Sequence, residues 1–444
     1  MRYFLAIIGG GAAGLMAGVA AGEAGIPAMI LERRHRPGLK LLMCGNNRCN
    51  ISHDAAAEEM LQDYGGEIGR FLKNAIDAFP PAYLRSWLQK HGLRTVVKRN
   101  RIYPIGENAD DVLHLFMDQL RELKIPIALN CPVKSVSREE DGCWRLITEN
   151  GLELRAKYIL LATGGISYPK TGSVGDGQRI AAELGHKVTE LRPGLAGMDT
   201  ESPIFNGTRE DNIEDATVTI RDASGRQIAV THGNILCNGG ILRGSAIFDA
   251  ARQIAHAGIA DFTASADLLP ALSSRQQTGN LNAILSRCGF PQALARNVIG
   301  CFGRLPVAET IARLKDLPLK ISGIRPVKEA IVTAGGVALD EIAPGTMESR
   351  IEPGLFFAGE LLDIDGPTGG YNLHSAFATA RLAVAEIARR IKGQAKPAQR
   401  KDRQGQGRRP EVENSQRHRE ERFSKGENPK NRYSDPRSSI WRGK

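Results

Sequence analysis

The glycine-rich segment GGGAAG at residues 9–14 constrains the fold of this chain more than any other feature. It follows directly on an apolar run at residues 3–8 and leads into small residues that continue to Gly22. A second apolar run, at residues 28–31, ends at Glu32. A G-x-G-x-x-G match alone is weak, but the order strand, glycine turn, helix, strand and acid is much more restrictive. The pattern predicts a βαβ unit whose helix N-terminus binds the pyrophosphate of a dinucleotide.

The residues of this unit have separate physical roles. Gly9 would make the tight turn out of the strand, and Gly11 would let the backbone approach a pyrophosphate. Gly14 would let the helix pack closely on the sheet. Glu32 lies 23 residues after Gly9, where its carboxylate can accept hydrogen bonds from an adenosine ribose and would repel the 2′-phosphate of NADP. The predicted dinucleotide site consists of Gly9, Gly11, Ala13, Gly14 and Glu32.

The uncharged stretch at residues 3–22 has two other interpretations, a membrane helix and the apolar core of a signal peptide. Three consecutive glycines in its middle speak against both, so no membrane partner is expected. The seven cysteines are odd in number and include no C-x-x-C pair. In a chain of 444 residues this argues against a secreted disulfide framework, and we expect a reducing, cytoplasmic location.

Later segments help to identify the dinucleotide, because no second G-x-G-x-x-G follows. Residues 158–165 and 354–360 each read as a buried strand that ends in a small-residue turn. A two-glycine turn at 369–370 precedes a helical pattern and would direct backbone N–H groups at a flavin. Together these segments favour FAD over NAD. The further cofactor-binding candidates are Thr163, Gly164, Gly359, Glu360, Gly369, Gly370, Asn372 and Leu373.

Five motifs give the sequence a specific resemblance to a known family. They read GGGAAG from residue 9, GLKLLMCGNNRCN from 38, ATGGISYPKTGSVGDG from 162, TMES from 346 and PGLFFAGELLDIDGPTGGYNLHSAFATA from 353. On these motifs the chain resembles the BaiN/RdsA family of NAD(P)/FAD-dependent oxidoreductases, also called YhiN-like flavoproteins, over roughly residues 1–390. It differs at His374, where the family usually has Gln, and at residues 45–47, where the family usually has three glycines.

The resemblance implies that FAD is bound, that NAD(P)H reduces it in a transient encounter, and that reduced FAD reduces a carbon–carbon double bond. Activities in the family are reduction of unsaturated steroid-like acids, reduction of a 23S ribosomal RNA uridine to dihydrouridine, and oxidation of aminoacetone. Because this chain ends in a basic segment, the RNA uridine is favoured. Two other classes stay open: an oxidase that reduces oxygen and ignores NAD(P)H, and a non-catalytic RNA-binding flavoprotein.

The expected fold class is α/β, and the resemblance implies a discontinuous Rossmann-like FAD-binding domain of the glutathione-reductase type. The family implies inserts in this domain. Residues 216–230 alternate and turn like a hairpin, whereas residues 268–319 carry apolar positions at helical spacing. The expected parts are the FAD-binding domain at 1–190 and 325–392, a β-rich, β-barrel-like substrate domain at 191–265, a small helical domain at 266–324 and a disordered basic tail at 393–444.

The basic charge is concentrated at the end of the chain. Residues 393–444 hold 15 Lys or Arg and 7 Asp or Glu, a net charge of +8 out of +10 for the whole chain. Few apolar residues and no periodicity indicate disorder. The tail is either a solvated basic segment or a contact to ribosomal RNA, in which basic side chains neutralise phosphates and Phe423, Tyr433 and Trp441 stack on bases.

Reduction of a double bond needs a proton donor within hydrogen-bond reach of the second carbon. Cys49 is the first candidate, His374 the second, and Tyr371 is also considered. The loop that matches the family's flavin-contacting motif supplies the cofactor candidates Lys40, Arg48 and Asn50. The expected substrate contacts are Tyr168, Thr171, Asp176 and His232.

The spacing of Cys44 and Cys49 also suggests a metal site or a redox disulfide. Zinc would need two more ligands and only His53 is near in sequence, so no metal is predicted. A disulfide reductase would need a second dinucleotide site and a C-terminal His-Glu dyad, which the sequence does not show. The favoured interpretation is a flavin-contacting loop in which Cys49 is a site candidate and Cys44 has no role.

Overall fold

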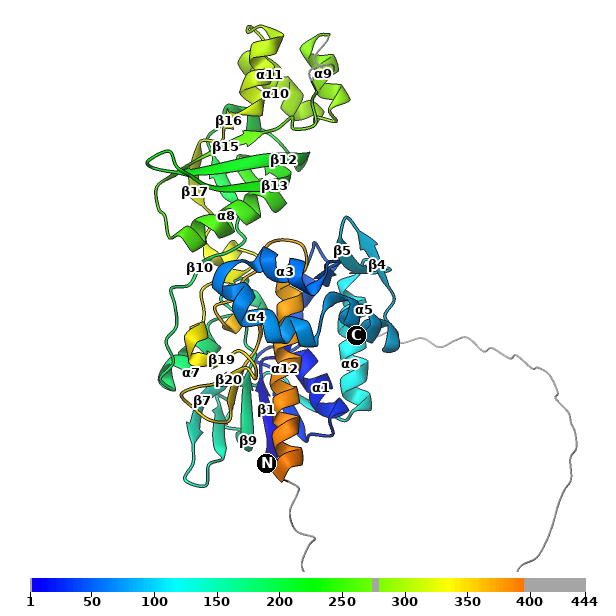
Figure 1. Cartoon of the computed structure of the whole chain (residues 1–444), viewed down its shortest axis with the longest axis vertical. Coiled ribbons are helices and arrows are strands. Elements are labelled where there is room, and N and C mark those ends of the chain that lie inside the picture. Colours follow the sequence, from blue (N-terminus) through cyan, green and yellow to red (C-terminus); the bar gives the residue numbers. More distant parts are fainter. Residues whose placement is uncertain (1, 274–278, 395–444) are drawn as a thin grey trace, which may run out of the picture. The chain divides into compact units, whose positions relative to one another are not determined.

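The computed structural model describes residues 2–273 and 279–394 (Figure 1). Residues 393 and 394 belong to helix α12, Tyr371–Gln394, and the rest of the tail predicted at 393–444 lies outside the described residues. The described chain is mixed α/β, which confirms the predicted fold class. Two sheets organise it, and each packs against its own hydrophobic core.

The larger sheet has nine strands and a parallel centre, in the order β21-β9-β1-β2-β6. The register pairs Ile8 with both Leu31 and Leu161, and Leu161 with Phe357. Four parallel strands therefore end level with one another, and the residues that follow them meet at one edge. The nine strands are β1 Arg2–Ile8, β2 Ala28–Leu31, β6 Ile127–Ala128, β7 Val133–Arg138, β8 Trp144–Thr148, β9 Glu153–Leu161, β19 Ile342–Ala343, β20 Glu348–Ser349 and β21 Leu355–Phe357.

Helix α1, Ala12–Glu23, explains why residues 3–22 carry no charge. It packs against β1, β2, helix α6 (Ala109–Glu122) and the long α12, which runs beside it in Figure 1. A Cβ on Gly14 would lie 1.8 Å from the carbonyl oxygen of Gly9. Only glycine therefore lets this helix approach the preceding turn so closely.

The second sheet has seven strands in the order β16-β15-β12-β13-β14-β11-β17, and α8 packs against β12 and β13. Its core uses residues between Ala196 and Ala330, whereas the first core uses residues up to Ala181 and again from Val337. The Rossmann-like part is therefore discontinuous in sequence, as predicted; the borders at 190, 265 and 324 stay predictions. The elements are β11 Met198–Thr200, β12 Asp211–Asp222, β13 Gln227–Asn238, β14 Ile241–Arg243, α8 Ser245–Ala257, β15 Phe262–Asp267, α9 Leu281–Arg287, α10 Gln292–Phe302, α11 Val307–Lys315, β16 Leu317–Pro318 and β17 Ile321–Ile324.

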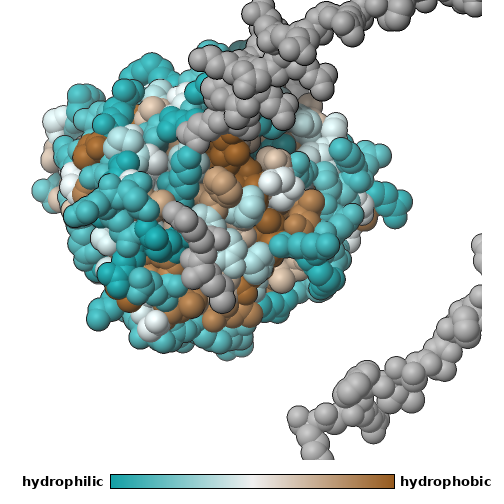
Figure 2. Space-filling model, turned by 90° about the horizontal axis from the view of Figure 1, so that it is seen from below, coloured by the Kyte–Doolittle hydropathy of each residue, from teal (hydrophilic) through white to brown (hydrophobic). Residues whose placement is uncertain are grey.

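Strands β10 Arg192–Pro193 and β18 Thr333–Ala334 form a two-stranded sheet. Further helices and strands surround the first sheet or form a small three-stranded sheet. They are α2 Leu39–Leu42, β3 Ser52–His53, α3 Ala57–Tyr64, α4 Gly66–Ala78, α5 Pro81–Lys90, β4 Thr95–Lys98, β5 Arg101–Pro104 and α7 Asp176–Glu183. Within the described ranges no helix is both long and apolar enough to cross a membrane. Figure 2 shows one face of the chain, on which hydrophilic residues predominate and hydrophobic residues form smaller groups.

Candidate cofactor and active site

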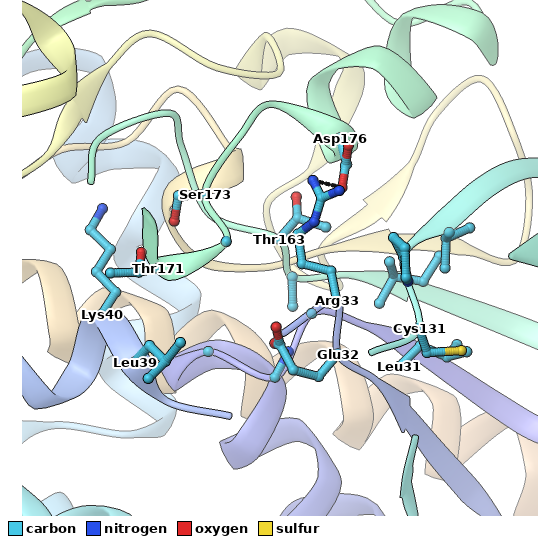
Figure 3. Close-up of a pocket in the computed structure, with 18 of the residues that line it drawn as sticks. Leu31, Glu32, Arg33, Leu39, Lys40, Cys131, Thr163, Thr171, Ser173 and Asp176 are labelled. Carbon is cyan, nitrogen blue, oxygen red and sulfur yellow. Dashed lines mark hydrogen bonds and ion pairs between the residues drawn. The ribbon is translucent and has the colours of Figure 1, made fainter. Parts of the chain in front are cut away.

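A pocket lies at the carboxyl edge of the parallel strands, where the glycine turn and the ends of β2 and β9 meet (Figure 3). Gly9 has a φ of +107°, and a Cβ there would lie 2.5 Å from the carbonyl oxygen of Ala162. The turn therefore needs glycine. A Cβ on Gly11 would meet no atom of the described residues within 4 Å, so the backbone there is open to the pocket. The predicted site residues that line the pocket are Gly9, Gly11, Glu32, Lys40, Thr163, Thr171 and Asp176.

The carboxylate of Glu32 is fixed by backbone groups on both sides. One oxygen accepts a hydrogen bond from the N–H of Gly10 at 2.7 Å, and the other from the N–H of Arg34 at 2.7 Å. Only 8% of the residue is exposed, and this burial raises the pKa of the carboxyl group against the opposing effect of the two N–H groups. The acid is therefore held in one orientation beside the glycine turn.

An ion pair crosses the pocket between Arg33 and Asp176 at 2.9 Å, as the dashed line in Figure 3 shows. Burial raises the pKa of Asp176, and Arg33 opposes that shift. Arg33 was not among the predicted site residues, although the basic run that follows Glu32 was a visible signal. Thr171 and Asp176, expected to contact substrate, lie in the same pocket as the glycine turn.

Lys40 connects α2 to the end of β21. Its Nζ donates to a carboxylate oxygen of Glu360 at 2.5 Å and to the hydroxyl of Ser167 at 2.7 Å. The other oxygen of Glu360 accepts from the N–H of Thr333 at 2.8 Å. Two predicted cofactor residues, 320 positions apart in sequence, thus form one ion pair whose side chains are 23% and 17% exposed.

The loop before α12 is shaped by close backbone contacts. Gly370 has a φ of +100°, and a Cβ there would lie 2.4 Å from the carbonyl carbon of Ser52. The side chain of Asn372 accepts from the N–H of Gly366 at 2.8 Å and donates to its carbonyl oxygen at 2.9 Å. Gly369 also has a positive φ, of +123°. The turn is therefore rigid, and the amide of Asn372 serves to hold it.

The two ring-bearing donor candidates of α12 have different surroundings. The ring of Tyr371 stacks on His53 at 5.0 Å, and its hydroxyl donates to the carboxylate of Asp63. Burial is the largest cause of the raised pKa of Tyr371, and the hydrogen bond to Asp63 raises it further. His374 is fully buried, with Nδ1 2.8 Å from the hydroxyl of Ser52 and Nε2 2.9 Å from the carbonyl oxygen of Phe79. Both ring nitrogens of His374 are thus already engaged.

The loop between α2 and β3 brings the two cysteines together, although only Cys49 was a predicted site residue. The N–H of Cys49 donates to the carbonyl oxygen of Cys44 at 2.9 Å, and the thiol of Cys44 donates to the carbonyl oxygen of Asn50 at 3.6 Å. Cys49 is fully buried, with a φ of +55°. Asn50 is also buried, and its Oδ1 has no partner in the described structure. Arg48 is half exposed and lies 3.7 Å from Glu107.

The remaining candidates, like Glu360, those of the cysteine loop and those at the start of α12, are not among the residues that line this pocket. His232 is exposed on β13 of the second sheet, 3.0 Å from the hydroxyl of Thr217. Tyr168 has a φ of +52°, and burial raises its pKa. Gly164, Gly359, Ala13, Gly14 and Leu373 contribute backbone or packing at the same strand ends and helix starts; a Cβ on Gly359 would lie 3.0 Å from the Cβ of Ala13.

The pocket fits a dinucleotide with an adenosine and a pyrophosphate. Among the residues that the structure describes, no side chain caps the N-terminus of α1, so the first-turn N–H groups beside Gly11 are available to phosphate oxygens. Thr163 lines the pocket, and its buried Oγ1 has no partner within the described chain. Glu32 stands where an adenosine ribose would be bound.

This fold and this pocket define a class of protein, the FAD-dependent oxidoreductases with a Rossmann-like domain. The family model described as "HI0933-like protein Rossmann domain" matches residues 3–386. The chain belongs to this HI0933-like family.

Two relatives and one solved structure show the extent of the similarity. The chain is 30% identical to a 3-dehydro-bile acid delta(4,6)-reductase of Clostridium scindens over 417 residues, which cover 87% of this chain and 99% of the relative. It is 27% identical to a ribosomal RNA dihydrouridine synthase of Escherichia coli, over 87% of this chain and 98% of the relative. The fold is similar to that of a 3-ketosteroid delta1-dehydrogenase from Sterolibacterium denitrificans, with a TM-score of 0.51, 14% identity, and 88% of this chain and 100% of that chain covered.

Proposed function

We propose that this chain binds FAD in the pocket beside Gly11 and uses it, with NADH or NADPH as the reductant, to reduce a carbon–carbon double bond. The observation that carries the proposal is the open pocket at the uncapped end of α1, with Glu32 fixed beside it. The names of the relatives support the reaction, because a 3-dehydro-delta(4,6) bile acid and a uridine both contain a double bond conjugated to a carbonyl group.

In this proposal the residues of the chain bind and orient the cofactor. The first-turn N–H groups of α1 hold the pyrophosphate, and Glu32 accepts hydrogen bonds from the ribose. The unpartnered Oγ1 of Thr163, which lines the pocket, gains a hydrogen-bond partner when the pocket is filled. The ion pair of Lys40 and Glu360 holds helix α2 against the end of β21. When bound, FAD supplies the hydride transfer.

The proton for the second carbon comes from a group that keeps its proton at neutral pH. Cys49 fits this requirement, because its hydrogen bond to Cys44 and its burial raise its pKa well above the usual range. Tyr371 fits it too, because burial and the neighbouring Asp63 raise its pKa. For His374, burial lowers the pKa to about 4, so it is neutral at pH 7 and its one N–H faces a backbone carbonyl. Cys49 and Tyr371 are therefore the stronger donor candidates.

The favoured substrate is a uridine of 23S ribosomal RNA. The similarity to a relative named ribosomal RNA dihydrouridine synthase extends over 98% of that relative. The net charge of +8 at residues 393–444 would favour binding to a polyanion such as RNA. The alternatives are a small unsaturated acid, in line with the bile acid reductase, and amine oxidation of the aminoacetone type. A non-catalytic RNA-binding flavoprotein is the alternative of another class.

The cofactor site is tested by Gly11→Ala. The new methyl group would meet no atom of the described residues within 4 Å, so folding should be unchanged while FAD binding falls at least about tenfold. The measurement is the flavin absorbance per protein, together with the thermal unfolding midpoint. Gly323→Ala is the matched control, because a Cβ there also meets no atom but lies on β17 of the second sheet. Equal flavin content in both variants would contradict the assignment of the FAD site to the pocket beside Gly11.

The reaction is tested by anaerobic mixing of the purified protein with NADH or NADPH. Bleaching of the flavin by either nucleotide supports the reductase, whereas bleaching by neither, with turnover of amine and oxygen, supports the oxidase. The RNA substrate is tested by mass spectrometry of 23S ribosomal RNA from a strain that lacks this chain. Loss of a dihydrouridine supports the proposal. An unchanged dihydrouridine content would exclude this RNA as the substrate and would favour a small unsaturated carbonyl compound.

A further inference from the structure

The loop from Cys44 to Cys49 folds back on itself. Three of its residues, Gly45, Asn46 and Asn47, have φ values of +59°, +55° and +65°. This left-handed turn brings the N–H of Cys49 to 2.9 Å from the carbonyl oxygen of Cys44. Two residues joined by such a backbone hydrogen bond have Cα atoms at a separation that a disulfide can span, about 4.4–6.8 Å.

The two thiols differ in access and in acidity. Cys44 is partly exposed, whereas Cys49 is fully buried beneath it. The interaction between the two thiols lowers the pKa of Cys44 and, together with burial, raises the pKa of Cys49 well above its usual range. The ammonium group of Lys40 also favours the thiolate of Cys44. A partly exposed cysteine with a lowered pKa beside a buried cysteine with a raised pKa is the arrangement of an attacking and a resolving cysteine.

We infer that Cys44 and Cys49 form a redox-active dithiol that a low-molecular-weight disulfide converts reversibly into an intramolecular disulfide. The thiolate of Cys44 attacks one sulfur of the small disulfide, whose S–S bond breaks, and one thiolate leaves. Cys49 then gives its proton to solvent and attacks the sulfur of Cys44, and the second small thiol is released. The protein loses two electrons and two protons, and the small disulfide becomes two thiols.

This inference goes beyond the proposed reduction of a double bond and does not depend on it. The dithiol lies next to α2, which carries Lys40. A change in the oxidation state of the two cysteines would therefore alter the surroundings of the cofactor site. The test below reads covalent bonds rather than turnover. A failure of the dithiol and a failure of the flavin reaction are therefore distinguishable.

Trypsin provides a direct assay, because it cleaves after Lys40, Arg48 and Arg70 and so places the two cysteines on separate peptides. The full-length protein as purified is treated with glutathione disulfide, quenched with acid, alkylated and digested without reductant. We expect the peptides 41–48 and 49–70 to appear joined by a disulfide in the mass spectrum, and to separate after addition of dithiothreitol. Absence of the joined peptide, with glutathione only on the exposed Cys288 and Cys301, would overturn the inference.

Variants separate the two roles. Cys49→Ser should stop the reaction halfway and accumulate glutathione on peptide 41–48. Cys44→Ser should slow modification of Cys49 at least about tenfold, because the buried thiol is neither accessible nor acidified. Cys49→Ala serves as a second variant at the buried position, and Cys288→Ser is the matched control that should form the joined peptide normally. Unchanged modification of Cys49 in Cys44→Ser would contradict the assigned roles.

Discussion

His374 shows how a single buried side chain makes stability depend on pH. Its ring is fully buried between the hydroxyl of Ser52 and the carbonyl oxygen of Phe79, and burial lowers its pKa to about 4. The unfolded chain takes up a proton near pH 6.5, while the folded chain does not. Stability therefore falls as the pH decreases from about 6.5 to about 4, and it is unaffected by this residue above that window.

The replacement His374→Gln should remove this acid sensitivity. The amide of Gln can still donate to Phe79 and accept from Ser52, and it does not titrate. We expect similar stability at pH 7 and a gain over the parent protein at pH 5, where the histidine costs up to about 1.4 kcal/mol per pH unit. Urea unfolding midpoints at the two pH values measure the effect. The exposed His114→Gln is the control and should keep the parent's pH dependence; equal pH dependence in both variants would contradict this account.

At the level of elements, the contact between α1 and the glycine turn depends on one missing methyl group. In Gly14→Ala the new Cβ would lie 1.8 Å from the carbonyl oxygen of Gly9, and backbone on both sides prevents relief. We expect a loss of at least about 3 kcal/mol of stability or failure to fold. Thermal unfolding and soluble yield measure it.

A second glycine of the same helix provides the comparison. A Cβ on Gly18 would meet only the side-chain tips of Ile30 and Leu120, at 2.7 and 2.8 Å. These tips can move, and alanine favours a helix over glycine by about 1 kcal/mol. Gly18→Ala should therefore lose clearly less stability than Gly14→Ala. The reverse order would show that the contact between Gly14 and Gly9 does not hold α1 in place.

A buried cluster of charged side chains joins helix α8, which packs on the second sheet, to the loop before α12. Arg252 donates to the carboxylate of Asp365 at 2.9 Å, and His256 lies 2.9 Å from the same carboxylate. The side chain of Asp365 is fully buried. Removal of Arg252 would leave this charge without its main partner.

We therefore expect Arg252→Met to lose about 3–5 kcal/mol of stability. Chemical unfolding measures the loss. Arg226→Met is the matched control, because Arg226 pairs with Asp222 on the surface with 76% of its side chain exposed, and such a pair contributes less than about 1 kcal/mol. A similar small loss in both variants would mean that the cluster does not stabilise the contact.

The sequence was informative where an element and its ligand-binding turn are neighbours in the chain. Gly9, Gly11 and Glu32 belong to one βαβ unit, so their spacing alone predicted that they share a pocket. The contact of Arg33 with Asp176 and that of Lys40 with Glu360 bridge 143 and 320 positions. No local pattern encodes these partners, because they depend on the order of strands in the sheet.

At the scale of the whole molecule, the charge of the chain is divided between a nearly neutral body and residues 393–444, with a net charge of +8. If these residues contact RNA, deletion of 396–444 should weaken RNA binding and reduce its dependence on salt. Flavin content and the unfolding midpoint should stay unchanged, because both cores lie within residues 5–387. Binding to a 23S RNA fragment at several salt concentrations is the measurement. Unchanged affinity would identify the segment as a solvated tail.

The late position of β21 in the chain has a consequence for synthesis. Residues 159–161 of β9 pair with β21 on one side, and that strand is formed by residues 355–357. At about 5–20 residues per second, a ribosome needs roughly 10–40 s to translate the intervening segment. During that time this edge of the nascent sheet has no partner strand, and unpaired edges are prone to aggregation. The chain is therefore exposed to misassembly during translation, and a chaperone that shields this edge would raise the yield of folded protein.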